Sequence, residues 1–191
     1  MVLALIKSLP AVTAGAYSEF LSHQTSWIMN PCNKLGRIVS RINRFSPRFR
    51  QPLMSFVFGR VIKFAGTASI SIPQLEFKAS VLQLKNRRKV QNHIGSVHAA
   101  ATALLGESAT GFLIGLHIPD DKIPLLKSMH VDYVKRSQGD LIAKATVTDQ
   151  QIEQMRNSEK GEVSVNVVVT DEKGNQPVNC EYIWAWVPKR L

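Results

Sequence analysis

The order of apolar and polar residues divides this chain of 191 residues into a helical beginning and a longer, strand-rich remainder. Beyond about residue 64, apolar and polar residues alternate, as they do in half-buried antiparallel strands, and one helical stretch interrupts this alternation. The predicted strands are 67–72, 74–84, 125–134, 141–148, 163–170 and 178–187, with Pro73 between the first two and a hairpin turn over 171–175.

The helical stretch between the second and third predicted strands is poor in large side chains. Residues 92–115 read NHIGSVHAAATALLGESATGFLIG, and the helix is expected to begin near Ser96, whose hydroxyl can cap the first free amides. A helix of Ala, Gly, Ser and Thr has little bulk, so it is stabilised best where another element wraps closely around it. The sequence therefore predicts an α+β layer fold, in which a curved antiparallel sheet wraps around one long central helix.

Glu107 is the only carboxylate in this helical stretch. A carboxylate that loses water when its helix docks needs a partner, a raised pKa or a chemical role. Glu107 is therefore the first candidate for chemistry. The alternative is a structural one, in which Glu107 bonds to backbone or to an arginine of another subunit and stabilises a dimer.

The beginning of the chain is helical in pattern and strongly basic. Residues 1–60 hold eight Lys or Arg and one acid, whereas the remainder holds sixteen Lys or Arg and thirteen acids. Mixed helical patterning covers 3–28, an amphipathic helix that Pro47 ends is expected over 34–43, and 53–64 is a further apolar stretch. The chain is thus divided into a basic N-terminal helical extension, residues 1–60, and a main domain, residues 61–191.

A basic extension of this kind is compatible with several partners. Anionic membrane surfaces, nucleic acids and phosphorylated ligands all attract positive charge, while a solvated basic helix face needs no partner. Nucleic acid is not expected, because Phe45 and Phe49 are the only aromatic residues interleaved with the basic residues of 34–50. The helices of the extension are expected to cover part of the sheet or a subunit interface.

Composition and spacing argue against several other kinds of site. Cys32 and Cys180 stand apart without CxxC or Cys/His spacing, so they are predicted to be free thiols in a reducing compartment. The histidines show no HxxxH or HxH spacing, so neither a metal site nor a cofactor is expected. The sequence also lacks a Walker loop, a dinucleotide fingerprint and a G-x-S-x-G elbow.

The apolar runs are too short for a membrane span. None reaches the roughly twenty residues that a bilayer requires. Lys7 and Pro10 also interrupt the apolar residues 2–16, whereas a secretory leader has an uninterrupted apolar centre. A cytoplasmic location is therefore expected, with organelle targeting by the Arg-rich, acid-poor beginning as the alternative.

Three residues of the helical stretch carry a resemblance to a known family. Asn92, His98 and Glu107 stand in the frame N-x-x-G-x-x-H-A-A-x(6)-E. This frame resembles the active-site segment N-x-x-G-x-x-H-G-G-x(6)-[DE] of the hotdog-fold acyl-CoA thioesterases. Together with FAGTASIS and MHVDYVKRSQGDL, it is similar to a poorly characterised branch of thioesterase-like hotdog domains, over residues 45–187.

The resemblance implies a role for each matched position. Glu107 falls where the family has its catalytic Asp or Glu, which acts as a general base on water or attacks the thioester itself. The Ala99 backbone amide falls where a glycine amide at the helix start meets the thioester carbonyl, and Asn92 falls where an Asn positions the water or the carbonyl. His98 is expected to be a structural hydrogen bonder at the helix start. Free amides and the positive end of a helix dipole suit a developing oxyanion, and a carboxylate suits the attacking water.

The sequence departs from the family at two places. The family's two glycines are Ala99 and Ala100, so the backbone is expected to approach a ligand less closely. The Ser or Thr that some members supply from the strand after the helix has no secure equivalent among Leu126, Lys127 and Ser128. Both departures bear on turnover more than on ligand binding.

Four basic residues are candidates for the phosphates of coenzyme A. They are Arg87, Arg88, Lys135 and Arg136, and for each one a solvated strand end is the alternative.

The expected function is metal-independent hydrolysis of an acyl thioester, with acyl-CoA as the substrate. The alternative is a non-catalytic hotdog module that binds acyl-CoA or assembles partners. The resemblance also implies a homodimer or homotetramer, in which two sheets join edge to edge. Glu107 of one chain would then face Asn92 and the Ala99 amide of the other.

Overall fold

A computed structural model describes residues 30–190 of the chain, and Pro31–Leu191 form one compact unit. The helical patterning predicted over 3–28 lies outside the described residues. The helices are α2 (Lys34–Ile42), α3 (Pro47–Val61), α4 (Lys63–Ala68), α5 (Ala99–Gly115) and α6 (Asp149–Asn157), with a 3-10 turn over Arg88–Val90. The strands are β1 (Ser71–Leu75), β2 (Ala79–Leu84), β3 (Lys122–Tyr133), β4 (Leu141–Thr146), β5 (Gly161–Asp171) and β6 (Val178–Pro188).

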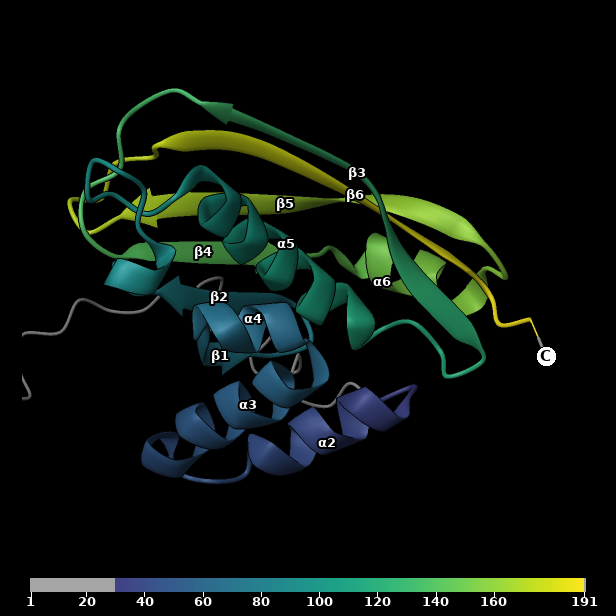
Figure 1. The fold of residues 1–191 in the computed structure, drawn as a ribbon. Helices are drawn as coiled ribbons and strands as arrows, with labels where there is room; N and C mark the ends of the chain where they lie inside the picture. Colours follow the sequence, from purple (N-terminus) through teal and green to yellow (C-terminus); the bar gives the residue numbers. More distant parts are fainter. Residues whose placement is uncertain (1–29, 191) are drawn as a thin grey trace, which may run out of the picture. The chain divides into compact units, whose positions relative to one another are not determined.

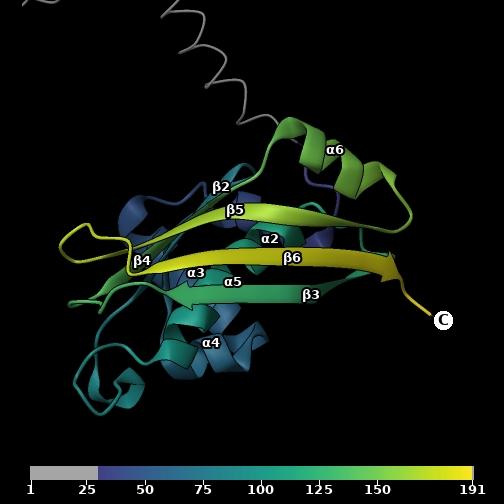
Figure 2. The same ribbon diagram turned by 90° about the horizontal axis from the view of Figure 1, so that it is seen from above.

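The six strands form one sheet in the order β1-β2-β4-β5-β6-β3, and every neighbouring pair is antiparallel. Figure 1 shows the sheet curving around α5, with α2, α3 and α4 gathered at the β1 end and β3 at the other end. In Figure 2, α6 lies beside β5, the strand that follows it. This α+β arrangement, a curved antiparallel sheet around one long helix, confirms the predicted hotdog fold.

Two glycines allow α5 to lie directly on the aromatic side chains of β6. A Cβ added at Gly106 would lie 2.4 Å from the hydroxyl oxygen of Tyr182, and one at Gly111 would lie 2.7 Å from the ring of Trp184. Real Cβ atoms do not make such approaches, so only glycine fits between the helix and these two rings. The small residues of the helix thus serve the close wrapping that the sequence predicted.

Hydrogen bonds from two strands of the sheet, β6 and β2, fix α5. The Tyr182 hydroxyl donates to the Ala103 carbonyl over 2.9 Å, and the Trp184 indole donates to the Thr110 hydroxyl over 2.9 Å. From β2, the Ser80 hydroxyl donates to the Ala109 carbonyl over 2.7 Å. Because all of these groups are buried, removing one partner would leave the other without a hydrogen bond and away from water.

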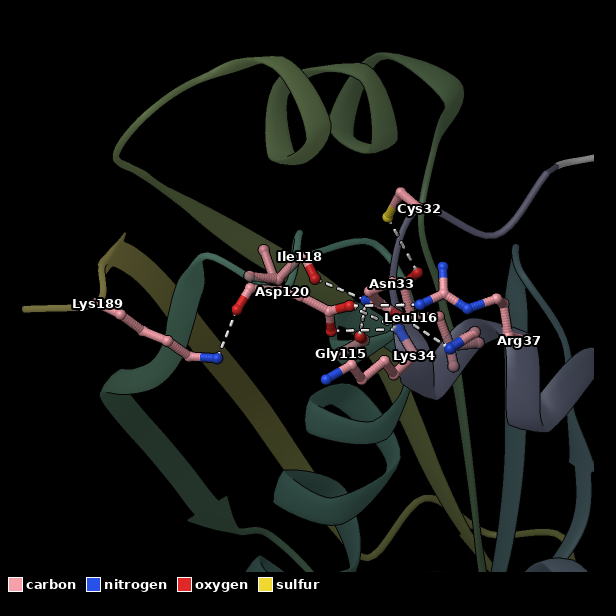
Figure 3. A network of polar contacts seen from close by, with 10 residues as sticks. Cys32, Asn33, Lys34, Arg37, Gly115, Leu116, Ile118, Asp120 and Lys189 are labelled. Carbon is pink, nitrogen blue, oxygen red and sulfur yellow. Dashed lines mark hydrogen bonds and ion pairs between the residues drawn. The ribbon is translucent and has the colours of Figure 1, made fainter. Parts of the chain in front are cut away.

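The C-terminal end of α5 is held by the residues that begin α2 (Figure 3). The Asn33 amide donates to the carbonyls of Gly115 over 2.8 Å and Ile118 over 2.6 Å, while its oxygen accepts from the Gly36 amide over 2.6 Å. Asn33 therefore caps the start of one helix and the end of another. The free thiol of Cys32 adds a 3.3 Å contact to the His117 carbonyl.

Near the N-terminal helices, the structure differs from several predictions. The helix expected over 34–43 does end before Pro47, at Ile42, but Pro47 also begins α3, because proline fits the first turn, where no amide needs a partner. The strand expected over 67–72 is helical up to Ala68 and becomes a strand only at Ser71. Pro73 lies inside β1, which tolerates it as an edge strand with an irregular register. The second strand accordingly starts at Ala79 instead of residue 74.

Two further differences concern helices. Helix α5 begins at Ala99, so its N-cap is His98 and not Ser96. The strand predicted over 141–148 ends at Thr146, and α6 follows it, a helix that the alternation pattern missed. The signal for α6 was the capping box, in which Thr148 and Gln151 bond each other's backbone amides. Among the helices of residues 30–190, none is long and apolar enough to cross a membrane.

Substitution of Gly111 by alanine tests the close approach of α5 to β6. The new methyl group would overlap the rigid ring of Trp184, so we expect the free energy of unfolding to fall by about 1–3 kcal/mol. Urea denaturation of Gly111→Ala measures this loss of stability, and Gly115→Ala is the matched control. At Gly115 a methyl would meet only the end of the Leu35 side chain, at 3.3 Å. Equal midpoints for the two variants would show that this contact does not limit the packing.

His117 predicts a loss of stability in mild acid. The side chain is fully buried, its Nε2 atom lies 2.6 Å from the Phe77 carbonyl, and burial lowers its pKa from 6.5 to about 4. The unfolded chain therefore binds the proton first, so stability is complete above pH 6.5 and declines as the pH falls towards about 4, by about 3 kcal/mol. Urea titrations across this range should show a flatter dependence for His117→Gln. If stability depended on pH as steeply in His117→Gln as in the unaltered protein, His117 would not be the origin of the acid sensitivity. The matched control is His130→Gln, at an exposed histidine.

Candidate functional site

The loop that precedes α5 is built around Asn92. The Asn92 side-chain oxygen accepts from the amides of Ile94 and Ser96, each over 3.1 Å, and its own backbone amide donates to the Ser96 carbonyl over 2.9 Å. Gly95 completes the turn with a φ of 75°, which a residue with a side chain rarely adopts. The Asn92 oxygen is therefore occupied by the loop, whereas its side-chain NH2 has no acceptor among the described residues.

His98 sets the start of α5. Its Nδ1 atom accepts from the Ala100 amide over 3.1 Å, and its backbone amide donates to the Val90 carbonyl over 2.8 Å. The ring thereby satisfies one of the free amides of the helix start, as an N-cap does. The Ala99 amide has no hydrogen-bond acceptor within residues 30–190, so it remains available to a ligand.

A cleft of about 430 Å³ opens beside this helix start. It brings together Asn92, Ala99, Lys135 and Arg136, four of the residues that the sequence singled out, and it is closed on one side by Tyr133. Loop, helix start and the end of β3 each contribute a wall. The lining therefore combines an open backbone amide, cationic side chains and apolar surface.

Two of the four predicted phosphate-binding residues lie at this cleft. The Arg136 guanidinium donates to the Ser96 hydroxyl over 3.1 Å and to the Ile94 carbonyl over 2.9 Å, so it also braces the Asn92 loop. Lys135 donates to the Asn175 side chain over 2.9 Å. Arg87 and Arg88 do not line the cleft, since Arg87 donates to the Ser69 carbonyl and Arg88 begins the 3-10 turn.

Glu107 lies two turns further along α5 and is half-buried. Its carboxylate takes part in no hydrogen bond or ion pair with any residue of the described part of the chain. Burial raises the pKa of the carboxyl above its usual value of 4.5. An unpaired, half-buried acid with a raised pKa is a candidate for a chemical role.

Within one chain, Glu107 and the Ala99 amide are too far apart to serve the same carbonyl group. Eight residues of α-helix separate them, which is about 12 Å along the axis. A base must come within about 3 Å of the proton that it removes. One chain therefore supplies two halves of a possible site that do not meet.

The two edges of the sheet differ in a way that bears on this separation. At the β1 edge, the Ser55 hydroxyl of α3 accepts from the Ile72 amide over 2.9 Å, so a helix covers that edge. β3 has β6 as its only neighbour in the described chain, and it exposes Leu126, Met129 and Tyr133. An open strand edge with exposed apolar side chains is suited to pairing with another strand.

Tyr133 is a site residue that the sequence did not single out. Its hydroxyl donates to the Ala99 carbonyl over 2.7 Å, and partial burial together with the nearby Cys180 thiol raises its pKa. Tyr133 thus ties the end of β3 to the first residue of α5. Its signal was the period of two along β3, which places Tyr133 on the same face as Met129 and Val131.

No group of three or more His, Cys, Asp or Glu side chains within residues 30–190 is arranged to hold a metal ion.

Comparison with protein families gives one match. The family described as a domain of unknown function (DUF4442) matches residues 50–187. No curated protein matches the chain. Solved structures do match it, and they support the resemblance to thioesterase-like hotdog domains.

Three of these structures come from bacteria. A protein of unknown function and probable thioesterase from Pseudomonas aeruginosa is 22% identical, with a TM-score of 0.65, and the match covers 72% of this chain and 95% of the other. A thioesterase variant from Staphylococcus aureus is 20% identical, with a TM-score of 0.57, and the match covers 66% of this chain and 99% of the other. A thioesterase from Haemophilus influenzae is 11% identical, with a TM-score of 0.57, and the match covers 75% of this chain and 92% of the other.

At these identities the structures show a common fold. The family match spans most of the described residues, and it includes the helix start, Glu107 and the end of β3. The chain therefore belongs to the family described as a domain of unknown function, DUF4442.

Proposed function

We propose that this protein hydrolyses acyl thioesters, with acyl-CoA as the substrate class and without a metal. The observation that carries the proposal is that one helix presents two groups without hydrogen-bond partners in the described chain, the Ala99 amide and the Glu107 carboxylate. Similarity in fold to proteins described as thioesterases supports the reaction type.

In the proposed reaction, the thioester carbonyl lies against the start of α5. The Ala99 amide donates to the carbonyl oxygen, and its hydrogen bond strengthens as negative charge develops there. The end of the helix dipole adds to this stabilisation. Glu107 takes a proton from water, the water oxygen bonds to the carbonyl carbon, and the C–S bond then breaks. The proton on Glu107 passes to the departing thiolate, so the products are a carboxylic acid and a thiol.

The Glu107 that acts on a given carbonyl belongs, in this proposal, to a second copy of the chain. Two copies joined through their β3 edges would form a continuous sheet, and a homodimer is the smallest assembly that completes the site. The open β3 edge and the roughly 12 Å between Ala99 and Glu107 within one chain support this arrangement. A dimer of such dimers, a homotetramer, is equally compatible with it.

Asn92 and the basic residues at the cleft have supporting roles. The side-chain NH2 of Asn92 is the group that would orient the water or the carbonyl, because its oxygen is engaged by the loop. Lys135 and Arg136 at the cleft are placed to meet the phosphates of coenzyme A. Arg87 and Arg88, which do not line the cleft, stay candidates for a distal phosphate.

The domain division and the location complete the proposal. Residues 61–191 would carry the catalytic domain and residues 1–60 the basic extension, which the hydrolytic step does not use. Two free thiols, Cys32 and Cys180, are compatible with a reducing compartment such as the cytoplasm.

Glu107→Gln tests the base directly. The amide keeps the shape of the side chain but cannot accept a proton, so kcat on a panel of acyl-CoA substrates should fall by about 100-fold or more, with little change in KM. Glu153→Gln, at an exposed acid of α6, is the matched control. Full activity in Glu107→Gln would exclude this residue as the base. Acyl-CoA binding without any turnover in the unaltered protein would instead identify a non-hydrolytic hotdog module.

The raised pKa of Glu107 predicts the acid limb of the pH profile. The base must be ionised to accept a proton, so kcat/KM should rise with pH and reach its midpoint above 4.5. Steady-state rates between pH 4 and 8 measure this midpoint. A midpoint at or below 4.5 would contradict a half-buried base.

Two substitutions at Asn92 separate its loop role from its chemical role. Asn92→Asp keeps the oxygen that accepts from Ile94 and Ser96 but removes the NH2 donor, whereas Asn92→Ala removes both. We expect both variants to lose about 10-fold or more in kcat, and only Asn92→Ala to unfold at a lower urea concentration. Wild-type activity in Asn92→Asp would assign Asn92 to the loop alone.

A further inference from the structure

Helix α3 is apolar on two faces. Its inner face carries Met54 and Phe58, which are buried, and the Phe58 ring lies 4.6 Å from that of Phe112. Its outer face carries Phe49, Leu53 and Phe56, spaced at i, i+4 and i+7, which places them in one row. The exposed fractions of these three are 70%, 38% and 59%. A helix on the surface of a water-soluble protein is normally polar on its outer face.

The segments at both ends of α3 extend this exposure. Phe45 precedes the helix, and Val61, Ile62 and Phe64 follow it, all exposed. Single exposed apolar side chains are ordinary, but a group of seven within twenty residues indicates a surface that meets another apolar phase.

The same stretch has an extreme charge. Residues 20–75 contain no Asp or Glu, and their eight cations are Lys34, Arg37, Arg41, Arg44, Arg48, Arg50, Arg60 and Lys63. Within residues 30–190, Arg37 is the only one of the eight with a carboxylate partner, Asp120. The Arg60 guanidinium stands 4.8 Å from the centre of the Phe56 ring, so cation and aromatic ring are presented together.

A groove of about 390 Å³ lies next to the outer face of α3. Phe56 and Arg60 line one wall, and Ser69 and Ile70 line the other. Arg87 and Lys89 bond to the carbonyl and hydroxyl oxygens of Ser69, which brings two more cations to the rim. A row of apolar side chains with cations at the rim of the neighbouring groove matches the depth profile of a phospholipid headgroup layer.

We propose that the outer face of α3 binds the surface of an anionic phospholipid membrane. Phe49, Leu53 and Phe56 enter the boundary between headgroups and acyl chains, while the surrounding arginines lie at the level of the lipid phosphates. The protein is then peripheral, held by buried apolar area together with the attraction of its cations to the negative lipid surface.

Charge complementarity favours an anionic membrane over two other occupants of this face, a second copy of the chain and residues 1–29 of the chain itself. A second copy would bring the same cation-rich face, because a two-fold contact pairs a surface with itself, and like charges would oppose it. Residues 1–29 of the chain hold one acid, Glu19, and one cation, Lys7, so they bring no net negative charge to the eight cations of residues 34–63. An anionic lipid surface provides both the negative charge and the apolar layer.

The position of α3 leaves the proposed active site free. Helix α3 packs on β1, at one edge of the sheet, and β3 forms the opposite edge (Figure 1). Membrane contact through α3 and pairing through β3 are therefore compatible. The membrane proposal does not depend on thioester hydrolysis.

Vesicle co-sedimentation of the full-length protein tests the proposal. Phosphatidylcholine vesicles containing phosphatidylserine should bind the protein, more weakly as salt rises, and pure phosphatidylcholine vesicles should bind it far less. The double variant Phe49→Ser/Phe56→Ser should reduce partitioning by about 10-fold or more. The triple variant Arg44→Gln/Arg48→Gln/Arg60→Gln should reduce it on the order of 100-fold.

Two matched controls carry the same changes elsewhere. Lys144→Gln/Lys160→Gln/Lys173→Gln removes three exposed charges, and Ile123→Ser/Leu125→Ser removes two exposed apolar side chains of β3. Both should bind vesicles within about two-fold of the unaltered protein, and circular dichroism should show that all variants are folded.

Four results would overturn the proposal. They are no binding to anionic vesicles, equal binding to neutral ones, binding that both α3 variants retain, and RNA binding in place of vesicle binding. Self-association that Phe49→Ser/Phe56→Ser abolishes, without vesicle binding, would identify the face as a contact between copies.

Discussion

The structure depends on the direct contact between α5 and the aromatic side chains of β6. Gly106 and Gly111 leave the helix backbone so close to Tyr182 and Trp184 that no side chain fits between them. This closeness lets the Tyr182 hydroxyl and the Trp184 indole reach hydrogen-bond acceptors on the helix itself. A bulkier helix would stand further from the sheet, and those buried polar groups would lose their partners.

The same contact determines what the helix can do chemically. Because α5 is held along its length and at both ends, the Ala99 amide and the backbone of Glu107 are fixed relative to the cleft and to β3. Fixed donors stabilise a developing charge better than mobile ones, since they need no reorganisation when the charge appears. Both groups lie on one helix, about two turns apart, and the proposed site is therefore one that a second copy along β3 would complete.

The two edges of the sheet differ in what covers them. At β1, helix α3 and the Ser55 hydroxyl close the edge. At β3, the backbone remains available for pairing and apolar side chains are exposed beside the cleft. The surface exposed by α3 is of another kind, aromatic and cationic, on a helix whose inner face is already buried.

The sequence by itself determined the hotdog layering and most strand positions, and it singled out the candidate residues on and around α5. Local patterns carry this information, because alternation and small-residue content follow directly from which side of an element is buried. The sequence analysis missed α4 and α6, because short helices show little periodicity, and it missed the N-cap His98, because a single capping side chain leaves no periodic pattern. Only the tertiary structure decided that Lys135 and Arg136 meet Asn92 and Ala99 at one cleft while Arg87 and Arg88 do not, and that Tyr133 ties β3 to the helix start. Such contacts join residues about forty positions apart, and their geometry follows from sheet order and register, which no local pattern encodes.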